Sequence, residues 1–305
     1  MKRRETNLKS LFSSQGHWFK GMLHTHTTES DGWLSPERVL KAYKNMGFDF
    51  VCLTDHWKVT PKPEKTPEGV LYIPGVELDG GATEAGNFHL VGIDVRDNAV
   101  FKPTKPNKEY SARELLELLR AENGLVALAH PSWNGVTCAD AADIADDLFA
   151  MEVWNSGCDV EIGRGLADVQ WDDLLSRNHK IKGIAVDDAH RYYIDSGRGW
   201  VMVKAETLSR QAIRAALEKG EYYSSTGPII HDVLLDDAAI TIKCSPVRKI
   251  DLVSSPTKGQ STLAPRGSNL TEHTFLLSNG IGRYARLRIM DSAGCLAWTN
   301  PVFFN

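Results

Sequence analysis

Short apolar runs alternate with amphipathic stretches from residue 17 to residue 228. A short apolar run bounded by polar or turn residues is typical of a buried strand, whereas apolar residues spaced three and four apart indicate a helix. Strands are therefore predicted at residues 17–23, 50–53, 71–76, 88–93, 125–129, 151–154, 181–186, 199–203 and 222–226. Helices are predicted to follow Ser35 and Ser111 and to occupy residues 139–148, 163–176 and 209–219.

Two of the predicted helices have clear start signals. Ser35 precedes Pro36, which combines an N-cap residue with the first helical position, where proline is readily accepted. Ser111 and Glu114 form a capping-box pattern ahead of a face of leucines. Gly47 is predicted to end the first of these helices, because glycine adopts the left-handed conformation that terminates helices.

The alternation of strands and helices predicts an α/β fold in which helices cover parallel strands from outside. After residue 228 the helical periodicity disappears, and short runs of valine, isoleucine, leucine and phenylalanine alternate with turns. The segments Asp236-Asp237 and Ser292-Ala293-Gly294 are typical of hairpin turns. We therefore predict one domain over residues 1–228 and a small antiparallel, β-sandwich-like domain over residues 229–305.

Composition and charge narrow the classes of function. The chain has 305 residues, of which 42% are hydrophobic and 24% charged, as in an ordinary globular protein. The net charge of −4 provides no overall basic field that would gather nucleic acid. The five cysteines are scattered without a CxxC pair, so neither a disulfide framework nor a cysteine zinc site is indicated. Without a signal-peptide pattern or an apolar run of about 20 residues, a cytoplasmic protein that does not cross a membrane is expected.

Candidate chemistry begins in the segment HTHTTESDG, residues 24–32, directly after the first predicted strand. His24 and His26 are two residues apart, and residues with this spacing on an extended segment point to the same side. Both imidazoles can therefore bind one cation, and Asp31 can return from the loop as a further ligand. An HxH pair alone is weak evidence, but similar groups recur after other apolar runs.

Five further polar residues lie at the carboxyl end of a predicted strand or just beyond it: His56, Glu77, His130, Asp188 and His190. In parallel α/β barrels these ends meet on one face, where catalytic groups collect. The shared position of these residues predicts a common site.

Each of these residues also has a plainer interpretation. Asp31 could be a turn residue before glycine. Asp188 and His190 could belong to an exposed loop, and His130 could be a strand-end residue without a role. His89 lies near the start of its predicted strand, and a core histidine explains it as well as a ligand does. The coincidence at successive strand ends favours the site for the set as a whole.

Imidazole and carboxylate groups suit zinc, manganese or iron. Nine candidates exceed the four ligands of one tetrahedral ion, so two or three divalent ions are expected, with Glu77 bridging two of them. The expected allocation is His24, His26, Glu77 and Asp188 for the first ion, Glu77, His89 and His130 for the second, and Asp31, His56 and His190 for the third.

Other residues beside these candidates have two interpretations each. Asp55 and Asp187 could orient neighbouring ligands by hydrogen bonds or could be loop carboxylates. Trp133 and Trp154, which follow strand ends, could line a pocket or pack in the core.

The motifs HTHTTESDG, TDH, GVE, AHP and DDAH, in this order, resemble those of the PHP (polymerase and histidinol phosphatase) family of metal-dependent phosphoesterases. The resemblance covers roughly residues 17–228 and implies a distorted (βα)7 barrel. The C-terminal region is similar to a β-domain appended in a subgroup that includes carbamate-hydrolysing members. Some members have histidine where this chain has Asp31, and a carboxylate there changes the charge at the third metal. The family's ligand pattern falls on His24, His26, Asp31, His56, Glu77, His89, His130, Asp188 and His190.

The resemblance implies phosphoester hydrolysis, in which hydroxide formed from a metal-bound water attacks phosphorus. Glu77, Asp188 and His190 are the expected catalytic residues, and Arg191 and Lys58 are the expected substrate contacts. The expected partner is a small phosphorylated substrate, with a nucleotide or oligonucleotide as an alternative. Hydrolysis of carbamate or amide esters by the same metals is the second candidate function, and a non-catalytic metal-containing binding module is the third.

Overall fold

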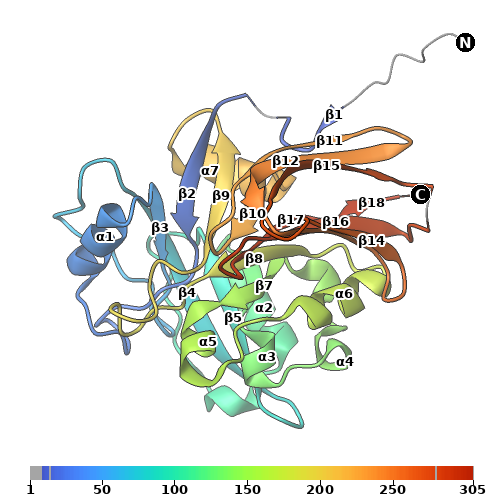
Figure 1. Cartoon of the computed structure of the whole chain (residues 1–305). Helices are drawn as coiled ribbons and strands as arrows, with labels where there is room; N and C mark the ends of the chain where they lie inside the picture. The colour runs from blue at the N-terminus through green and yellow to red at the C-terminus, as the bar shows by residue number, and fades with distance from the viewer. Residues whose placement is uncertain (1–8, 14, 279, 305) are drawn as a thin grey trace, which may run out of the picture.

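The computed structural model describes residues 9–13, 15–278 and 280–304, and its strands form two sheets (Figure 1). The larger sheet has 14 strands in the order β14-β13-β16-β17-β10-β9-β2-β3-β4-β5-β6-β7-β8, with β18 paired to β16. The smaller sheet has four strands in the order β1-β11-β12-β15. In Figure 1 the C-terminal strands, coloured orange and red, form two layers beside the α/β part of the molecule.

The first strands of the α/β part are parallel, as predicted. β2 (His17–Met22), β3 (Phe50–Leu53) and β4 (Leu71–Ala82) lie side by side in this orientation. All four residues of β3 are buried, as expected for an apolar strand between two neighbours. β4 is longer than predicted and continues six residues beyond 76 to end at Ala82.

The strand direction changes at β5. β5 (Asn87–Ile93) is antiparallel both to β4 and to β6 (Leu125–Leu128), and β7 (Ala150–Asn155) and β8 (Lys182–Val186) are parallel to β6. β9 (Trp200–Ala205) is antiparallel to β2, and β10 (Tyr222–Ser225) is antiparallel to β9.

Most of the helices follow the predicted segments. The larger ones are α1 (Pro36–Asn45), α2 (Ala112–Ala121), α5 (Ser156–Ile162), α6 (Asp168–Ser176) and α7 (Arg210–Lys219). The shorter ones are η1 (Asn107–Glu109), α3 (Pro131–Asn134), α4 (Cys138–Ala141) and η2 (Ala145–Asp147). The predicted helix at 139–148 is therefore two short turns, and the one at 163–176 begins only at residue 168. The predicted capping box forms, because the Ser111 hydroxyl and the Glu114 carboxylate each bond the other's backbone amide.

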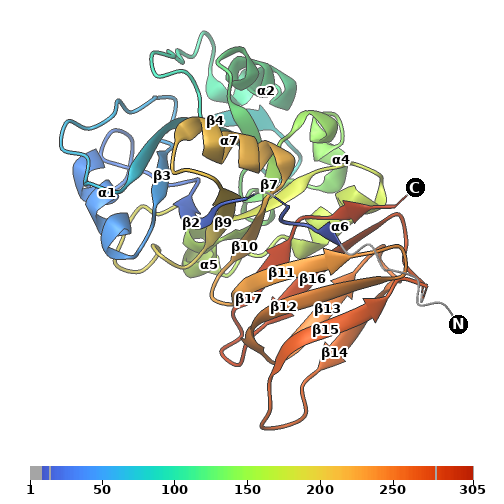
Figure 2. The ribbon, with the colours of Figure 1, turned by 90° about the horizontal axis from the view of Figure 1, so that it is seen from above.

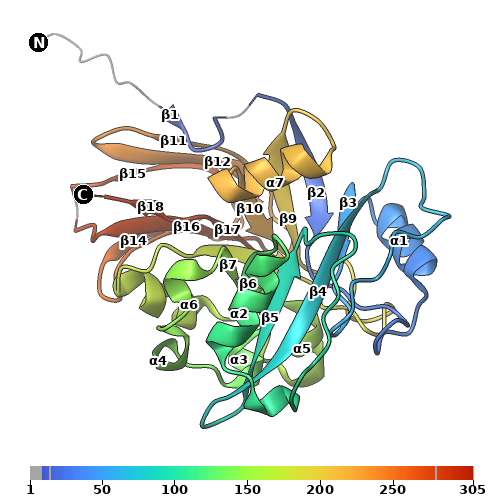
Figure 3. The ribbon, with the colours of Figure 1, turned by 180° about the vertical axis from the view of Figure 1, so that it is seen from behind.

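A regular (βα)7 barrel is not confirmed. The connection from β4 to β5 is a hairpin, and among the described residues no helix joins β3 to β4. Just beyond the carboxyl ends of β2 and β8 the chain segments are bonded to each other: the Asp188 amide donates to the His24 carbonyl at 2.9 Å, and the His26 amide donates to the Ala189 carbonyl at 3.2 Å. α2 packs on β4, β5 and β6 from the outside (Figure 3). The α/β part is thus a mixed sheet that curves until the carboxyl ends of β2 and β8 meet. The segment HTHTTESDG, residues 24–32, begins at this end of the sheet.

The C-terminal strands are antiparallel, as predicted. They are β11 (Ile230–Leu235), β12 (Ala239–Val247), β13 (Lys249–Val253), β14 (Gly259–Leu263), β15 (Leu270–Leu276), β16 (Tyr284–Met290), β17 (Leu296–Thr299) and β18 (Val302–Phe303). They gather on the side of the molecule away from α1 (Figure 2).

Two strand pairs connect this C-terminal part to the rest of the chain. β17 pairs with β10, so the large sheet runs across residue 228 without interruption. β1 (Lys9–Ser10), from the beginning of the described chain, pairs with β11 in the small sheet. Buried side chains from both sheets, including Ile242, Leu287 and Tyr223, form one apolar core between them. The division into domains at residue 228 stays a prediction.

Among the helices of the described residues, none has both the length and the apolar composition needed to cross a membrane.

Candidate metal centre

Glu77 lies at the centre of the predicted set and contacts five imidazoles. Its Oε2 atom is 3.2 Å from His24 Nε2 and 3.1 Å from His26 Nε2. Its Oε1 atom is 2.8 Å from His89 Nδ1 and 3.2 Å from His130 Nε2. The two carboxylate oxygens therefore face different histidines, which is the geometry that a carboxylate shared by two cations requires. The fifth imidazole is that of His56, 3.5 Å from Oε2.

Asp188 contacts two of the same imidazoles as Glu77. Its Oδ1 atom is 3.3 Å from His24 Nε2 and 3.1 Å from His26 Nε2, and these two nitrogens are themselves 3.1 Å apart. Oδ1 is buried and, among the described residues, has no hydrogen bond of good geometry. With Glu77, two nitrogens and two oxygens thus converge on one point, which suits a tetrahedral cation.

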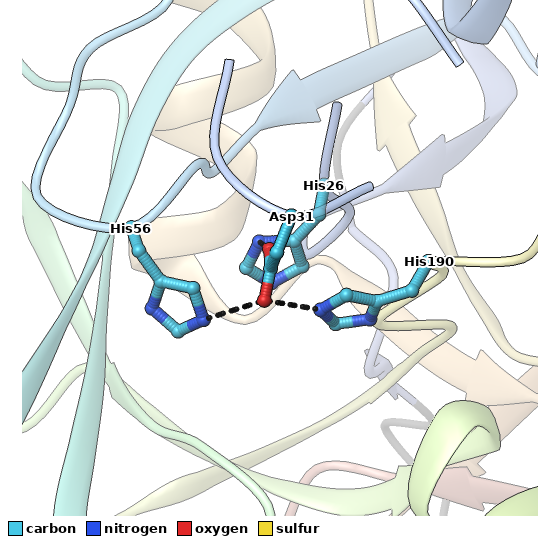
Figure 4. A group of neighbouring side chains, drawn as sticks. All are labelled: His26, Asp31, His56 and His190. Atoms are coloured by element: carbon cyan, nitrogen blue, oxygen red, sulfur yellow. Dashed lines mark ion pairs between the residues drawn. The ribbon is translucent and has the colours of Figure 1, made fainter. Parts of the chain in front are cut away.

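A third group lies nearer to solvent and is built on Asp31 (Figure 4). Its Oδ2 atom is 3.3 Å from His190 Nε2 and 3.6 Å from His56 Nε2. Its Oδ1 atom is 3.4 Å from His26 Nδ1, so His26 presents one ring nitrogen to this group and the other to the group of Asp188. The side chain of Asp31 is 53% exposed, so this edge of the cluster is open to solvent.

The structure thus brings all nine predicted side chains into one cluster. The predicted first group, His24, His26, Glu77 and Asp188, lies together with its ligand atoms within 4.8 Å of one another. The other two groups differ slightly from the expected allocation, because His56 joins Glu77 and His89, and His26 joins Asp31, His56 and His190. His130 still contacts Glu77, as given above.

Strand direction explains how these residues meet. Most follow the carboxyl ends of parallel strands, as predicted, but Glu77 lies inside β4, and His89 lies near the start of β5. Because β5 is antiparallel to β4, Asp79 is the cross-strand partner of His89, and the start of β5 reaches the same edge of the sheet. The Gly80-Gly81 segment, which lies beyond the strand predicted at 71–76, belongs to β4, and the strand register shifts between Gly80 and Ala82.

The backbone around the cluster includes unusual conformations. His130 has a φ of 26° and Asp188 a φ of 52°, and Trp57 and Tyr192, next to other cluster residues, are at 53° and 45°. Non-glycine residues with positive φ are uncommon, and their concentration at one place is typical of functional sites.

Glu152 is a buried residue of the site that the sequence interpretation missed. Its Oε1 atom is 2.6 Å from His24 Nδ1, and its Oε2 atom accepts hydrogen bonds of 2.8 Å from the His130 amide and the Asn155 side chain. Asn155 also donates to Asp188 Oδ2 at 3.1 Å. The sequence did contain a signal for it: Glu152 is the single acidic residue of the apolar strand β7. A carboxylate buried in such a strand requires hydrogen-bond or charged partners.

Asp55 and Asp187 accept hydrogen bonds from loop residues near the cluster. Asp55 accepts hydrogen bonds from the Thr27 amide at 2.8 Å and from the Ser30 hydroxyl at 2.8 Å, and it thereby fixes the loop that carries Asp31. Asp187 accepts from the Arg198 and Gly199 amides, both at 2.9 Å. Among the described residues, the hydrogen-bond partners of both carboxylates are loop and helix groups rather than the cluster imidazoles.

Charged and hydrogen-bonded neighbours outweigh burial at Glu77 and His26. Burial alone would raise the pKa of Glu77, but the imidazoles of His24, His56 and His89 hold this pKa well below its usual range. Burial would lower the pKa of His26, yet hydrogen bonds to Asp188 and Glu77 raise it to about 10. With these shifts the carboxylate is ionised and the imidazole carries the proton at neutral pH. A divalent cation can replace such a proton between the two groups. The nitrogen and oxygen donors therefore fit zinc, manganese or iron.

A cavity of about 370 Å³ opens onto the cluster. Arg191 lines it, as do Trp133 and Trp33. Lys58 is not among its lining residues and forms an ion pair with Glu29 instead. Trp154 is also absent from the lining. Of the two tryptophans that could have lined a pocket, Trp133 therefore does so and Trp154 does not.

No protein-family model and no curated protein matches the chain. Among solved structures, a two-domain protein from Bacteroides vulgatus that contains a predicted PHP-like metal-dependent phosphoesterase is similar over 99% of both chains, with 16% identity and a TM-score of 0.53. A candidate metal-dependent phosphoesterase from Bifidobacterium adolescentis has 17% identity and a TM-score of 0.47, over 66% of this chain and 96% of its own. An amidohydrolase from Chromobacterium violaceum, with sulfate bound and no metal, has 14% identity and a TM-score of 0.45, over the same shares.

The first of these similarities spans the α/β part and the C-terminal strands together. At this level of identity it shows a common fold, so the resemblance to PHP proteins drawn from the motifs is confirmed at the level of the fold.

Proposed function

We propose that this chain, which has the fold of a two-domain PHP-like protein, is a metal-dependent hydrolase whose substrates are phosphoric esters. The observation that carries the proposal is the cluster of nine imidazole and carboxylate side chains around Glu77, at the floor of an open cavity. A purely structural metal site is usually closed by protein ligands, whereas a catalytic site keeps a position open for water or substrate. The cavity and the exposed edge at Asp31 favour the catalytic alternative over a binding module.

The three groups of side chains would hold two or three divalent ions, with Glu77 shared between two of them. When bound, such ions acidify a coordinated water near neutral pH and stabilise charge on the ester oxygens. Glu152 would keep the His24 ring oriented through its Nδ1 atom, as carboxylates commonly do for metal-binding histidines. Asp188, whose Oδ1 lies beside the Nε2 atoms of His24 and His26, would be a further ligand of the ion that these two histidines hold.

Arg191 is the best candidate for contact with a phosphate. Among the described residues its guanidinium group forms no hydrogen bond or ion pair, and it lines the cavity. A guanidinium can donate two parallel hydrogen bonds to two phosphate oxygens. His190, whose side chain is 32% exposed and whose Nε2 faces Asp31, also lines the cavity and can hold a proton near the ester when only two ions are bound.

A small phosphorylated substrate and a cytoplasmic location are part of this proposal. Hydrolysis of carbamate or amide esters is the second candidate function. It is favoured because, among the described residues, Arg191 is the one lysine or arginine that lines the cavity, and phosphate sites commonly have more. Comparison of an aryl phosphate with an aryl carbamate at equal metal content separates the two functions.

Glu77→Gln tests the proposal directly. This change keeps the size of the side chain but removes the charge that the cluster imidazoles face. We expect kcat/KM for an aryl phosphate to fall by more than about 100-fold, since even partners of metal ligands cost 10- to 100-fold when changed. Bound metal, measured by mass spectrometry, should fall as well, while far-ultraviolet circular dichroism stays unchanged.

Glu122→Gln is the matched control, because Glu122 pairs with Arg96 at the surface. It should behave as the unmodified protein. Near-normal turnover by the Glu77 variant would contradict the proposed function.

A further inference from the structure

We infer that the site acts on small esters whose organic group is aromatic or bulky and apolar, and that Trp33 and Ile194 hold this group. The inference rests on the proposed function and adds the class of substrate. It follows from the walls of the cavity rather than from the metal ligands.

Exposed apolar side chains gather at the mouth of the cavity. Trp33 is 63% exposed, Ile194 44% and Val160 37%, and all three line the cavity. They come from three separate segments: the loop after the histidine motif, the loop after β8, and α5. Their meeting is therefore a product of the fold. Large apolar groups left in contact with water are stabilised when a ligand covers them.

Trp133 forms another part of the wall of the same cavity. Its Nε1 atom donates to Glu161 Oε2 at 3.0 Å, which holds the indole in place. Its ring lies edge-on to the rings of His130 and His89, with centroid distances of 5.2 and 6.2 Å. This wall brings an apolar surface next to the cluster where the ester would react.

Trp33 is placed differently. Its backbone amide donates to the His190 carbonyl at 2.9 Å, which ties its position to the cluster. Its ring, in contrast, is exposed, and among the described residues it has no aromatic or cation–π partner. An exposed ring held beside a reactive centre can stack on a planar group or pack against a branched one.

The charges of the cavity indicate a substrate with one anionic centre. Within the described part of the chain, Arg191 is the only lysine or arginine that lines it, and the carboxylates of Glu161 and Asp195 line it too. Lys58 is paired with Glu29, as described above. An oligonucleotide is bound through several phosphates, each with its own cationic partner. The cavity volume of about 370 Å³ suits a small molecule.

The test uses two substrates with leaving groups of similar reactivity, 2-phenylethyl phosphate and ethyl phosphate. For the metal-loaded protein we expect kcat/KM to be at least about tenfold higher for the phenylethyl ester, because burial of an aromatic group of this size is worth about that much. Trp33→Ala should reduce this ratio by about fivefold or more, through KM. The change in kcat/KM for ethyl phosphate should be several-fold smaller than the change for the phenylethyl ester.

Tyr193→Ala is the matched control. Tyr193 is 82% exposed and lies on the loop of Ile194, but it does not line the cavity, so the ratio should not change. Equal kcat/KM values for the two esters, or an equal loss of both in the Trp33 variant, would overturn the inference and leave the proposed function intact. Strong competition by a single-stranded oligonucleotide would overturn the inference as well.

The inference is separable from the proposed function. If the metal-loaded protein hydrolyses no phosphate or carbamate ester, the proposed function fails. Calorimetric binding of 2-phenylethylphosphonate and ethylphosphonate then tests the apolar subsite by itself. Binding of the phenylethyl compound at least about tenfold more tightly, with loss of this preference in Trp33→Ala, supports the subsite. Equal affinities overturn it.

Discussion

Single side chains at the centre of this protein each serve several contacts. Glu77 presents one oxygen to His24 and His26 and the other to His89 and His130. Glu152 contacts the His24 ring nitrogen Nδ1 with one oxygen and accepts a hydrogen bond from the His130 amide with the other. Because both carboxylates are buried, any loss of a partner leaves an unsatisfied charged group, which costs more than the loss of one ordinary hydrogen bond.

Glu152→Gln is expected to weaken metal binding. The amide keeps the shape of the carboxylate but loses its charge, so His24 is held less firmly and becomes a poorer ligand. We expect the affinity for zinc or manganese to fall by about 10- to 100-fold, as is typical when a partner of a metal ligand is changed. Competition with a chelator of known affinity measures this effect.

Asp146→Asn is the control for Glu152→Gln. Asp146 makes a similar contact, 2.8 Å to His179 Nδ1, but it lies at the surface outside the cluster. Its metal affinity should be unchanged, and an equal loss in both variants would show that Glu152 has no special role.

Among the secondary-structure elements, the C-terminal strands depend on a carboxylate in the middle of their sheet. Asp251 on β13 accepts a hydrogen bond of 2.6 Å from Ser261 on β14 and lies 3.0 Å from the guanidinium of Arg288 on β16. Lys249 adds a contact of 2.9 Å. Burial would raise the pKa of Asp251, but these partners hold it below its usual value of 3.8. Three neighbouring strands are thus joined by one ionised side chain.

The second prediction follows from that lowered pKa. A folded-state pKa below 3.8 means that the ionised Asp251 stabilises the fold at pH values above 3.8 and that this contribution is lost as the pH falls below it. Asp251→Asn should therefore lower the free energy of unfolding by about 1–3 kcal/mol at pH 7, and by progressively less below pH 4. Urea unfolding at pH 7 and pH 3 provides the measurement.

Asp237→Asn, in an exposed hairpin turn, is the control and should cost little at either pH. A loss for Asp251→Asn that is the same at both pH values would contradict the electrostatic explanation.

In the whole molecule, an ion-pair network joins α6 to the C-terminal strands. Arg286 on β16 donates to both oxygens of Asp172 on α6, at 2.8 and 2.6 Å, and packs over the Trp171 ring at 4.5 Å. Arg288 and Trp298 donate to Asp168 at 2.7 and 2.9 Å. Together with the β10–β17 pair, these contacts make the C-terminal strands a continuous extension of the α/β part.

The third prediction concerns Arg286→Met. The side chain of Arg286 is fully buried, and its removal leaves Asp172 without its bidentate partner. We expect the free energy of unfolding to fall by about 3 kcal/mol, as is typical when one partner of a buried pair is removed. Hydrolysis should be unchanged at temperatures where the variant is folded, because the network lies outside the cluster.

Arg177→Met is the control for this network. Arg177 follows the same helix, is 59% exposed and pairs with Asp173 at 3.5 Å, so its loss should cost less than about 1 kcal/mol. Equal destabilisation by both variants would contradict the role assigned to Arg286.

Local patterns in the chain were sufficient to predict the elements that depend on neighbouring residues. The capping box of Ser111 and Glu114, the helix start at Pro36 and the buried strand β3 follow from hydrogen bonding and apolar spacing within a few residues. The spacing of His24 and His26 likewise indicated that both rings face one point. The meeting of most of the candidate residues was predictable because the carboxyl ends of parallel strands share one edge.

Long-range pairing was decided only by the tertiary structure. His89 reaches the cluster because β5 runs against β4, and no periodicity within β5 encodes that direction. Glu152, Trp33 and Trp133 became parts of the site through contacts with residues distant in sequence. The pairing of β17 with β10 and of β1 with β11 has the same origin. Strand partners and cavity walls depend on burial shared by the whole chain, whereas caps and periodicity are properties of a few consecutive residues.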